Sequence, residues 1–501
     1  MTAAPNPIDS QIYRELPDGF YTEVVPSPNR APALLELNVR LLADYGVDES
    51  WFRTPAAAAI LTGHRINVSN PPVALAYAGH QFGHWVPLLG DGRASMLGQL
   101  RTYDGGRIDV QLKGSGRTRY SRGGDGRATL GSVLREYLVS EAMAGLSIPT
   151  TRSLAVLATG DPVTRDRIHP GAVLARTARS HVRVGTFQHA AVNHGPDAVR
   201  ALADHVIAHH FENLQSEPDQ YARLLESVIT RQARMIASWM LVGFIHGVMN
   251  TDNMSIVGET IDYGPCAFMD EFHPAKVFSS IDRRGRYAWQ QQPAIAHWNL
   301  TRLAEALLPL LAPASEQAVT IAEQRLAAFA PQFDAAFHEG LGAKLGFAAR
   351  SDASDAFGDT TLQLLSEQSL DFTLFFDRLT RVAADDNPEQ FLTQQASVDA
   401  GDAAGESRRR QGLHEWLAHW RTLRTGAALD VERMRRANPV LIARNHRVEQ
   451  AIAAAELEGH LRPFRRLAGA LRSPYEIAPA DQDLLLPPQP AERVRETFCG
   501  T

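Results

Sequence analysis

The sequence predicts an α+β protein in which a small β-rich lobe precedes a larger helical lobe. Strand-like runs dominate residues 85–176, helical periodicity dominates residues 197–472, and a polar motif in two parts lies at His246–Asn253 and Ile261–Gly264. A chain of 501 residues is long enough for one large domain or for two to three ordinary ones. The predicted organisation is an N-terminal extension at 1–70, the β-rich lobe at 71–185, the helical lobe at 186–480 and a tail at 481–501.

The β-rich lobe is predicted around Arg107–Lys113. Aliphatic residues alternate there with polar ones, which is the period of a half-buried strand and places Lys113 on the face opposite the core. Upstream, Trp85–Gln99 is expected to form strand, turn and strand. Gly90 and Gly92 in that turn let the backbone approach a ligand closely.

The next segment, Gly114–Arg127, is too rich in glycine for a regular element and lacks the Gly-Lys-Ser/Thr of a P-loop. We expect a flexible, arginine-bearing cover for phosphate. Only three of the 50 basic residues are lysines. A lysine in such a background is expected to act as a compact point charge, which the planar guanidinium of arginine does not reproduce.

A helix is predicted over Thr129–Leu146, and Glu136 on it is the expected ion-pair partner of Lys113. A solvated helix carboxylate is the alternative for Glu136. Two further strands are predicted at 151–159 and 172–176. The arginines from Arg176 to Arg183 are expected to bind phosphate, or else to lie on a solvated surface.

The helical lobe is expected to begin with helices at 197–214 and 221–242. A short strand at 254–257 should separate the two halves of the polar motif. Residues 296–472 should be mostly helical, with loops at 351–361 and 396–412.

The polar motif is typical of a phosphotransferase site from which one acid is missing. Protein kinases use H-R-D-x-x-x-x-N followed by D-F-G, in which the first Asp is the base and the Asn and second Asp hold magnesium. Val248 occupies the position of the base, whereas Asn253 lies five residues further on and Asp262 begins an Asp-Tyr-Gly triplet. The metal ligands are thus expected to be present and the chemistry to be altered.

Composition excludes several classes of function. A net charge of −6 argues against non-specific binding to nucleic acid or an anionic membrane. No apolar run approaches the length of a membrane span, so a cytoplasmic location is expected. Cys266 and Cys499 are too few for a disulfide framework or a cysteine-rich zinc site. His80 and His84 are interleaved with glycines and lack a third ligand, so a zinc pair is not expected.

These motifs together resemble the selenoprotein O family of kinase-like protein adenylyltransferases. The most specific pieces are Tyr77–Gly83, Gly90–Arg93, Leu112–Gly116, Gly124–Arg127, His246–Asn253 and Ile261–Pro265. The resemblance implies a protein-kinase-like two-lobed fold, with extra C-terminal helices, that binds ATP in reversed orientation and transfers AMP to Ser, Thr or Tyr hydroxyls of proteins. The same resemblance implies that the polyphosphate is held by Lys113, Asp125, Gly126, Arg176 and Arg183 and that the nucleotide lies against Gly90, Gly92 and Arg93. Glu136, as the partner of Lys113, and Asp262, as a metal ligand, complete the predicted nucleotide site.

The resemblance also assigns the acid-base role to Asp252 and the metal, Mg²⁺ or Mn²⁺, to Asn253 and Asp262. A base displaced along the loop is consistent with in-line attack on a different phosphorus. A loop-capping role is the alternative for Asp252. Cys266 and Cys499 both fall at positions that the family uses, and a bridge between them would gate activity by redox state; two unrelated thiols are the alternative.

Protein nucleotidyl transfer from ATP, with UTP as an alternative donor, is therefore the expected function. A kinase that transfers the γ-phosphoryl group is the second possibility. A catalytically silent nucleotide-binding scaffold is the third.

Overall fold

The computed structural model describes residues 5–25, 27–67, 69–385, 391, 403–423 and 430–498. Its fold is α+β and is built around one large antiparallel sheet. The strands of this sheet follow the order β1-β3-β6-β7-β10-β9-β2, and β8 pairs with β10. Their bounds are β1 Tyr21–Glu23, β2 Ala33–Leu37, β3 Val73–Leu75, β6 Ala94–Arg101, β7 Arg107–Lys113, β8 Ala128–Thr129, β9 Arg152–Thr164 and β10 Ile168–Ala178.

Helices cover both faces of this sheet. On one face, α1 (Val39–Tyr45) and α2 (Pro55–Leu61) bury their leucines against Val110 and Leu112 of β7. On the other, α3 (Leu130–Gly145) packs on β9 and β10 and is itself covered by α15 (Asn445–Leu457) and α16 (Arg462–Leu471). Because α3 is surrounded, it is buried on nearly every side, charged residues such as Glu136 and Glu141 included, rather than along one stripe.

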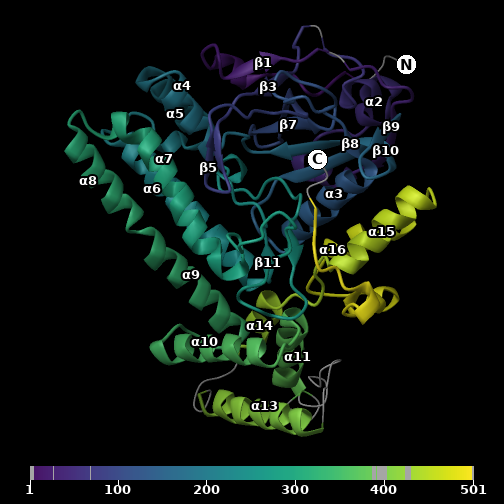
Figure 1. Ribbon diagram of the computed structural model, residues 1–501, viewed down its shortest axis with the longest axis vertical. Coiled ribbons are helices and arrows are strands. Elements are labelled where there is room, and N and C mark those ends of the chain that lie inside the picture. Colours follow the sequence, from purple (N-terminus) through teal and green to yellow (C-terminus); the bar gives the residue numbers. More distant parts are fainter. Residues whose placement is uncertain are drawn as a thin grey trace.

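The remaining helices form a second, larger body, which extends downward and to the left in Figure 1. Its centre is α6, which packs against α7, α8 and α9. The chain then returns toward the sheet (Figure 1), so that residues of the segment 494–498 line the same cavity as β8 and the start of α3. The bounds of the remaining helices are α4 Val184–Asn193, α5 Pro196–His210, α6 Gln220–Leu241, α7 Gln292–Leu311, α8 Ser315–Leu326, α9 Phe329–Lys344, α10 Asp352–Glu367, α11 Phe372–Asp385, α13 Ala403–Leu423 and α14 Val431–Ala437.

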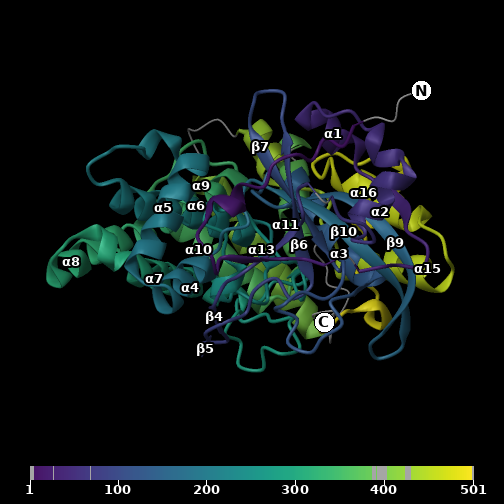
Figure 2. The same ribbon diagram turned by 90° about the horizontal axis from the view of Figure 1, so that it is seen from above.

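Two small strand pairs lie outside the large sheet. β4 (Gly79–Gln81) pairs with β5 (His84–Val86), and Figure 2 shows this hairpin beside α4, apart from the large sheet. β11 (Phe244–Ile245) pairs with β12 (Ala267–Phe268). Among the described residues, no helix combines the length and apolar character needed to cross a bilayer.

Several predicted elements are confirmed. The helix over Thr129–Leu146 is α3, and the helices expected at 197–214 and 221–242 are α5, followed by a short 3₁₀ turn, and α6. The strands predicted at 151–159 and 172–176 are the longer β9 and β10, which form one hairpin. The first 70 residues contribute β1 and β2 to the large sheet.

Other predictions of local structure were wrong. Trp85–Gln99 contains the predicted strand, turn and strand, as β5 and β6, but the two strands do not pair with each other, because β5 pairs back to β4 and β6 pairs with β7. Residues 254–257 do not form the predicted strand. Ser255 only makes an isolated antiparallel β-bridge with Arg183. The loop expected at 351–361 is the start of α10, where the Ser351 side chain accepts a hydrogen bond from Ser354 N and caps the helix. Of the loop expected at 396–412, residues 396–402 lie outside the described residues and 403–412 belong to α13.

Candidate nucleotide-binding and catalytic site

The two halves of the polar motif lie between the paired strands β11 and β12: the first half follows β11, and the second half precedes β12. His246 directly follows β11, and its Nε2 lies 2.9 Å from the carbonyl oxygen of Ile261. The intervening chain turns back at Asp262, whose φ of 65° is unusual for a residue with a side chain. Such local strain is often found at functional sites. The strand pair therefore brings Asp252, Asn253 and Asp262 to one place.

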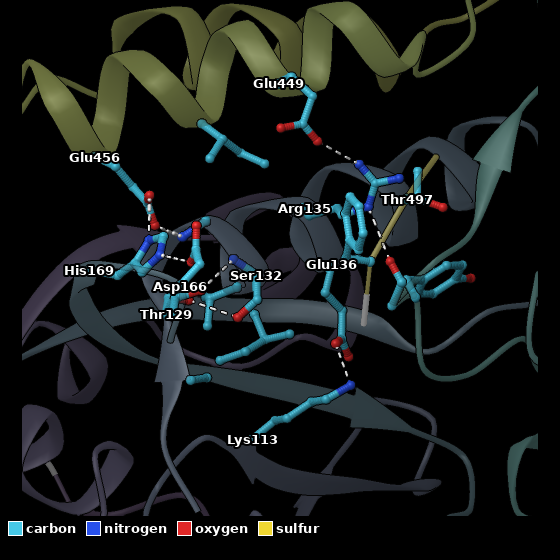
Figure 3. A pocket seen from close by; sticks show the side chains of 18 of the residues that line it. Lys113, Thr129, Ser132, Arg135, Glu136, Asp166, His169, Glu449, Glu456 and Thr497 are labelled. Carbon is cyan, nitrogen blue, oxygen red and sulfur yellow. Dashed lines mark hydrogen bonds and ion pairs between the residues drawn. The ribbon is translucent and has the colours of Figure 1, made fainter. Parts of the chain in front are cut away.

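Lys113 ends β7 and lies between two carboxylates. Its Nζ is 2.6 Å from Glu136 Oε2 on α3 and 2.6 Å from Asp262 Oδ1. The predicted pair with Glu136 is thus present in the structure, and Glu136 is buried rather than solvated. Figure 3 shows Glu136 reaching from its helix toward Lys113 on the sheet below.

Two arginines complete this cluster of charges. Arg176 on β10 donates from Nη1 to Glu136 at 2.8 Å and to Asp262 at 2.9 Å, and Gln111 fixes its other nitrogens. Arg183 donates to the second Asp262 oxygen at 3.1 Å and to the carbonyl oxygen of Asp252 at 2.8 Å. Both guanidinium groups are buried, which excludes the solvated-surface alternative for these two arginines.

The carboxylates of this cluster are held in the ionised form. Burial by itself raises the pKa of Asp262, but attraction to Lys113, Arg176 and Arg183 outweighs it and leaves the pKa well below the usual value. The pKa of Glu136 is also lowered, because Lys113 and Arg176 outweigh the effect of burial. The cations are therefore neutralised in part by the protein itself.

Asp252 has the opposite electrostatic character. Burial raises its pKa to about 6, even though Arg183 nearby favours the charged form. Its Oδ1 is buried without a hydrogen-bond partner, and it lies close to Gly79 of β4, where an added Cβ would be 3.0 Å away. An underused, buried carboxylate beside a cavity is a candidate general base. Hydrogen bonds from its own backbone N–H and from the Gln81 side chain also favour the charged form of Asp252.

Asn253 presents an oxygen ligand to the same cavity. Its Nδ2 donates to the carbonyl oxygen of Val248 at 3.0 Å, which fixes the orientation of the amide. The amide oxygen of Asn253 and the carboxylate of Asp262 belong to residues that line one cavity. Oxygen donors of this kind suit Mg²⁺ or Mn²⁺, so the residues present fit the expected metal.

The cavity has a volume of about 320 Å³ and collects nearly all of the predicted site residues. Seven basic side chains line it against four carboxylates, so its lining favours a polyanion. The predicted residues that line it are Gly90, Gly92, Arg93, Lys113, Asp125, Gly126, Arg176, Arg183, Asp252, Asn253 and Asp262. Glu136 lies behind Lys113 rather than in the lining.

Two glycine-rich turns form part of the wall. Gly90 has a φ of 78°, and a Cβ there would collide with the ring of Tyr120. Gly126 has a φ of 68°, and a Cβ there would collide with the backbone of Gly116. Side chains are therefore excluded at both turns, and the backbone itself faces the cavity.

Asp125 is oriented differently from a direct phosphate ligand. Arg165 donates to its two oxygens at 2.8 and 2.9 Å, and these hydrogen bonds lower its pKa. Sequence reasoning missed Arg165, which lies at the tip of the β9–β10 hairpin, 40 residues from its partner. It also missed Tyr77, whose ring lies 4.6 Å from the Arg183 guanidinium. No local pattern marks Arg165, whereas Tyr77 begins the motif Tyr77–Gly83 and could have been found from it.

A second cavity, of about 430 Å³, lies behind the Lys113–Glu136 pair (Figure 3). Glu456 of α15 enters it and accepts hydrogen bonds from Gly131 N at 2.7 Å and Arg167 at 3.0 Å. Arg135 of α3 reaches Glu449 of α15 at 3.1 Å. These contacts fix the C-terminal helices against α3 and so support the helix that carries Glu136.

Of the two cysteines, Cys266 is buried directly before β12. Cys499 lies outside the described residues, so the predicted bridge is not tested. Thr497, two residues before Cys499, donates from its hydroxyl to the carbonyl oxygen of Pro265 at 2.5 Å. The tail therefore passes beside the segment that contains Cys266.

The His80 side chain is held by other side chains of the protein. His80 and His84 sit across the β4–β5 hairpin, and His80 is engaged by Gln188 at 3.0 Å and packs on Trp85. Within the described part of the chain, one group of three potential metal ligands is found, formed by Glu15, His205 and His209. It lies on α5 and the N-terminal segment, apart from the cavity.

Comparisons with known proteins show the family to which the chain is similar. The model of the family "Protein adenylyltransferase SelO" matches residues 9–472. The chain is 50% identical over 497 residues to "Protein nucleotidyltransferase YdiU" of Shewanella denitrificans, covering 99% of this chain and 98% of that protein. It is 52% identical over 501 residues to the protein of the same name from Rhodopseudomonas palustris strain BisB5, covering 99% of each.

Proposed function

Since this chain belongs to the protein adenylyltransferase SelO family, we propose that it transfers AMP from ATP to hydroxyl groups of Ser, Thr or Tyr on proteins. The observation that carries the proposal is the arrangement of Asp252 and Lys113. One cavity is lined by Asp252, a buried base with a raised pKa, and by three cations that are suited to bind phosphate. Two residues with oxygen ligands for a metal line the same cavity.

In the proposed reaction, Asp252 accepts the proton of the acceptor hydroxyl while its oxygen attacks the α-phosphorus of ATP. The bond from the α-phosphorus to the bridging oxygen breaks, pyrophosphate leaves, and AMP stays on the acceptor. With a pKa of about 6, Asp252 is ionised at neutral pH and is more basic than an ordinary aspartate.

The cations have the task of holding the triphosphate. In the free protein, the Asp262 carboxylate is bound by Lys113, Arg176 and Arg183. These three side chains therefore already form a position that stabilises anionic oxygens. The backbone at Gly90 and Gly126 lets the nucleotide approach closely. Asp125 acts by orienting Arg165 toward the same space.

Asn253 and Asp262 would hold Mg²⁺ or Mn²⁺. When bound, the metal neutralises charge that builds on the phosphate oxygens and on the pyrophosphate leaving group.

The finer architecture belongs to the same proposal. We infer a kinase-like arrangement in which the large sheet with α3 is the small lobe and α4–α14 form the large lobe. The Lys113–Glu136 pair between β7 and α3 supports it, because kinases pair a strand lysine with a helix glutamate. A cytoplasmic location, use of UTP and a Cys266–Cys499 bridge stay predictions. Peptide mapping without reductant tests the bridge, and it fails if both thiols are free under oxidising conditions.

ATP labelled at either the α or the γ phosphorus tests the function. The proposal predicts that protein retains the α label and loses the γ label. Retention of the γ label would show a kinase instead. A silent scaffold would leave no label on any protein. Nucleotide would still stabilise such a protein against unfolding, to the same extent with and without Asp252→Ala.

A further inference from the structure

We propose that the acceptor protein docks through an acidic segment on a basic, aromatic surface next to Asp252. This inference rests on the proposed function and specifies the class of acceptor. We call this region the basic surface. It comprises Trp85 of the β4–β5 hairpin, Arg283, Arg284 and Arg286 of the loop before α7, and Trp298 and Arg302 of α7.

The basic surface is connected directly to the catalytic loop. The amide oxygen of Asn250, two residues before Asp252, accepts hydrogen bonds from Phe82 N at 2.9 Å and from the Tyr287 hydroxyl at 2.6 Å. Phe82 belongs to the turn of the β4–β5 hairpin, and Tyr287 belongs to the arginine-bearing loop. Figure 2 shows this loop below the hairpin. Both elements therefore flank the loop that carries the proposed base.

The charge of this region is opposite to that of the whole chain. From Lys276 to Arg302 the sequence has five basic residues and one acidic residue, in a chain of net charge −6. The single acid, Asp282, is buried and accepts hydrogen bonds from the backbone N–H groups of Arg286 and Tyr287. It is therefore used to shape the loop. Arg283 and Arg284 are exposed on it.

The aromatic residues hold two of the arginines in place. The guanidinium groups of Arg286 and Arg302 lie over the ring of Trp298, at 4.9 and 5.2 Å from its centroid. A guanidinium held on an aromatic face keeps its edge available for a carboxylate. Arg302 is already paired within α7 with Glu305 at 2.6 Å, so its charge is neutralised in part by this chain. Trp85, 37% exposed, adds an apolar contact at the border.

An acceptor hydroxyl must come within hydrogen-bonding reach of Asp252 to lose its proton. The residues on either side of that hydroxyl then extend over the surrounding surface, by about 3.3–3.6 Å per residue in an extended segment. Acidic residues a few positions from the modified hydroxyl would therefore meet the arginines. The net charge of −6 disfavours nucleic acid and anionic lipid surfaces, so the arginines can attract an acidic partner only locally, which suits a short acidic segment.

The test uses three peptides of equal length, each with one central Ser flanked by Glu, Gln or Lys, with α-labelled ATP and metal. The full-length protein is compared with an Arg283→Glu/Arg284→Glu variant. Arg435→Glu/Arg436→Glu, two exposed neighbours on α14, is the matched control. Binding of a non-hydrolysable ATP analogue and self-modification are measured for all three proteins.

The inference predicts that kcat/KM for the Glu peptide exceeds that for the Gln peptide, and that the variant loses this preference by at least about 10-fold at low salt. The control keeps it, and nucleotide binding is unchanged throughout. Equal modification of the three peptides, or self-modification with no peptide modified, overturns the acidic-segment inference but leaves the proposed function intact. No α label on any protein or peptide defeats the proposed function itself.

Discussion

Replacement of Asp252 by Asn separates the catalytic role of this residue from its cost to the fold. Asp252 is 8% exposed, and burial raises its pKa from 3.8 to about 6. The folded protein thus binds this proton more tightly than the unfolded chain does. Stability is lost as the pH rises from 3.8 through about 6, because the carboxylate must ionise in a buried place.

The size of this cost follows from the pKa. A shift from 3.8 to about 6 corresponds to about 3 kcal/mol of free energy of unfolding, since one pKa unit is about 1.4 kcal/mol. Asp252→Asn removes the ionisation and should stabilise the protein by up to about 3 kcal/mol at pH 8. At pH 5 the gain should fall to about half of that. Transfer should slow by at least about 100-fold, the usual scale for loss of a general base.

The assay combines urea denaturation at pH 5 and pH 8, nucleotide titration, and single-turnover transfer. Nucleotide affinity should be unchanged, because Arg183 is held by a hydrogen bond to the backbone carbonyl oxygen of Asp252, which the substitution keeps. Asp262→Asn is the matched control and should destabilise the protein, because the low pKa of Asp262 reports stabilisation by three cations. A less stable Asp252→Asn variant that also loses nucleotide affinity would refute the reasoning and make Asp252 a structural residue.

Four other perturbations follow from the site. The transfer rate should rise with pH to a plateau with a midpoint near 6, as ionised Asp252 is the active form; a pH-independent rate between 5 and 8 would contradict this. Lys113→Arg should weaken nucleotide binding by about 10-fold in calorimetric titration, because a planar fork does not fit the position 2.6 Å from Glu136; unchanged affinity would show that any cation suffices. Asn253→Ala should require a higher metal concentration for half-maximal transfer, and an unchanged metal titration would remove it as a ligand. Glu456→Gln should lower the free energy of unfolding by about 1–3 kcal/mol, since it weakens the contact between α15 and α3; equal stability would mean that this contact is dispensable.

The sequence was informative where one short segment carries the signal. Alternation placed Lys113 correctly at the end of β7, and helical spacing placed Glu136 on α3. The polar face of β7 was expected to be less buried than it is. Asp109 is fully buried because Tyr13 and His181, each more than 70 residues away, bind it at 2.5 and 3.1 Å. Alternation reports which face is apolar and cannot report what covers the other face.

Long-range geometry explains the remaining differences. Arg165 reaches the cavity only because the β9–β10 hairpin folds back over it, and the arginines of the basic surface meet Trp298 only in the folded chain. The segment 351–361, predicted as a loop, carries a local signal for a helix. Its polar composition concealed a helix start, in which Ser351 caps the first turn and Phe357 and Leu365 are buried below it.

The central claim is that ATP lies with its α-phosphorus, and not its γ-phosphorus, toward the proposed base. The most direct measurement is a crystal structure of this protein with a non-hydrolysable ATP analogue and Mg²⁺ or Mn²⁺. The account predicts that the α-phosphorus is the phosphorus nearest to the Asp252 carboxylate, with the terminal phosphates among Lys113, Arg176 and Arg183. A γ-phosphorus nearest to Asp252 would contradict it.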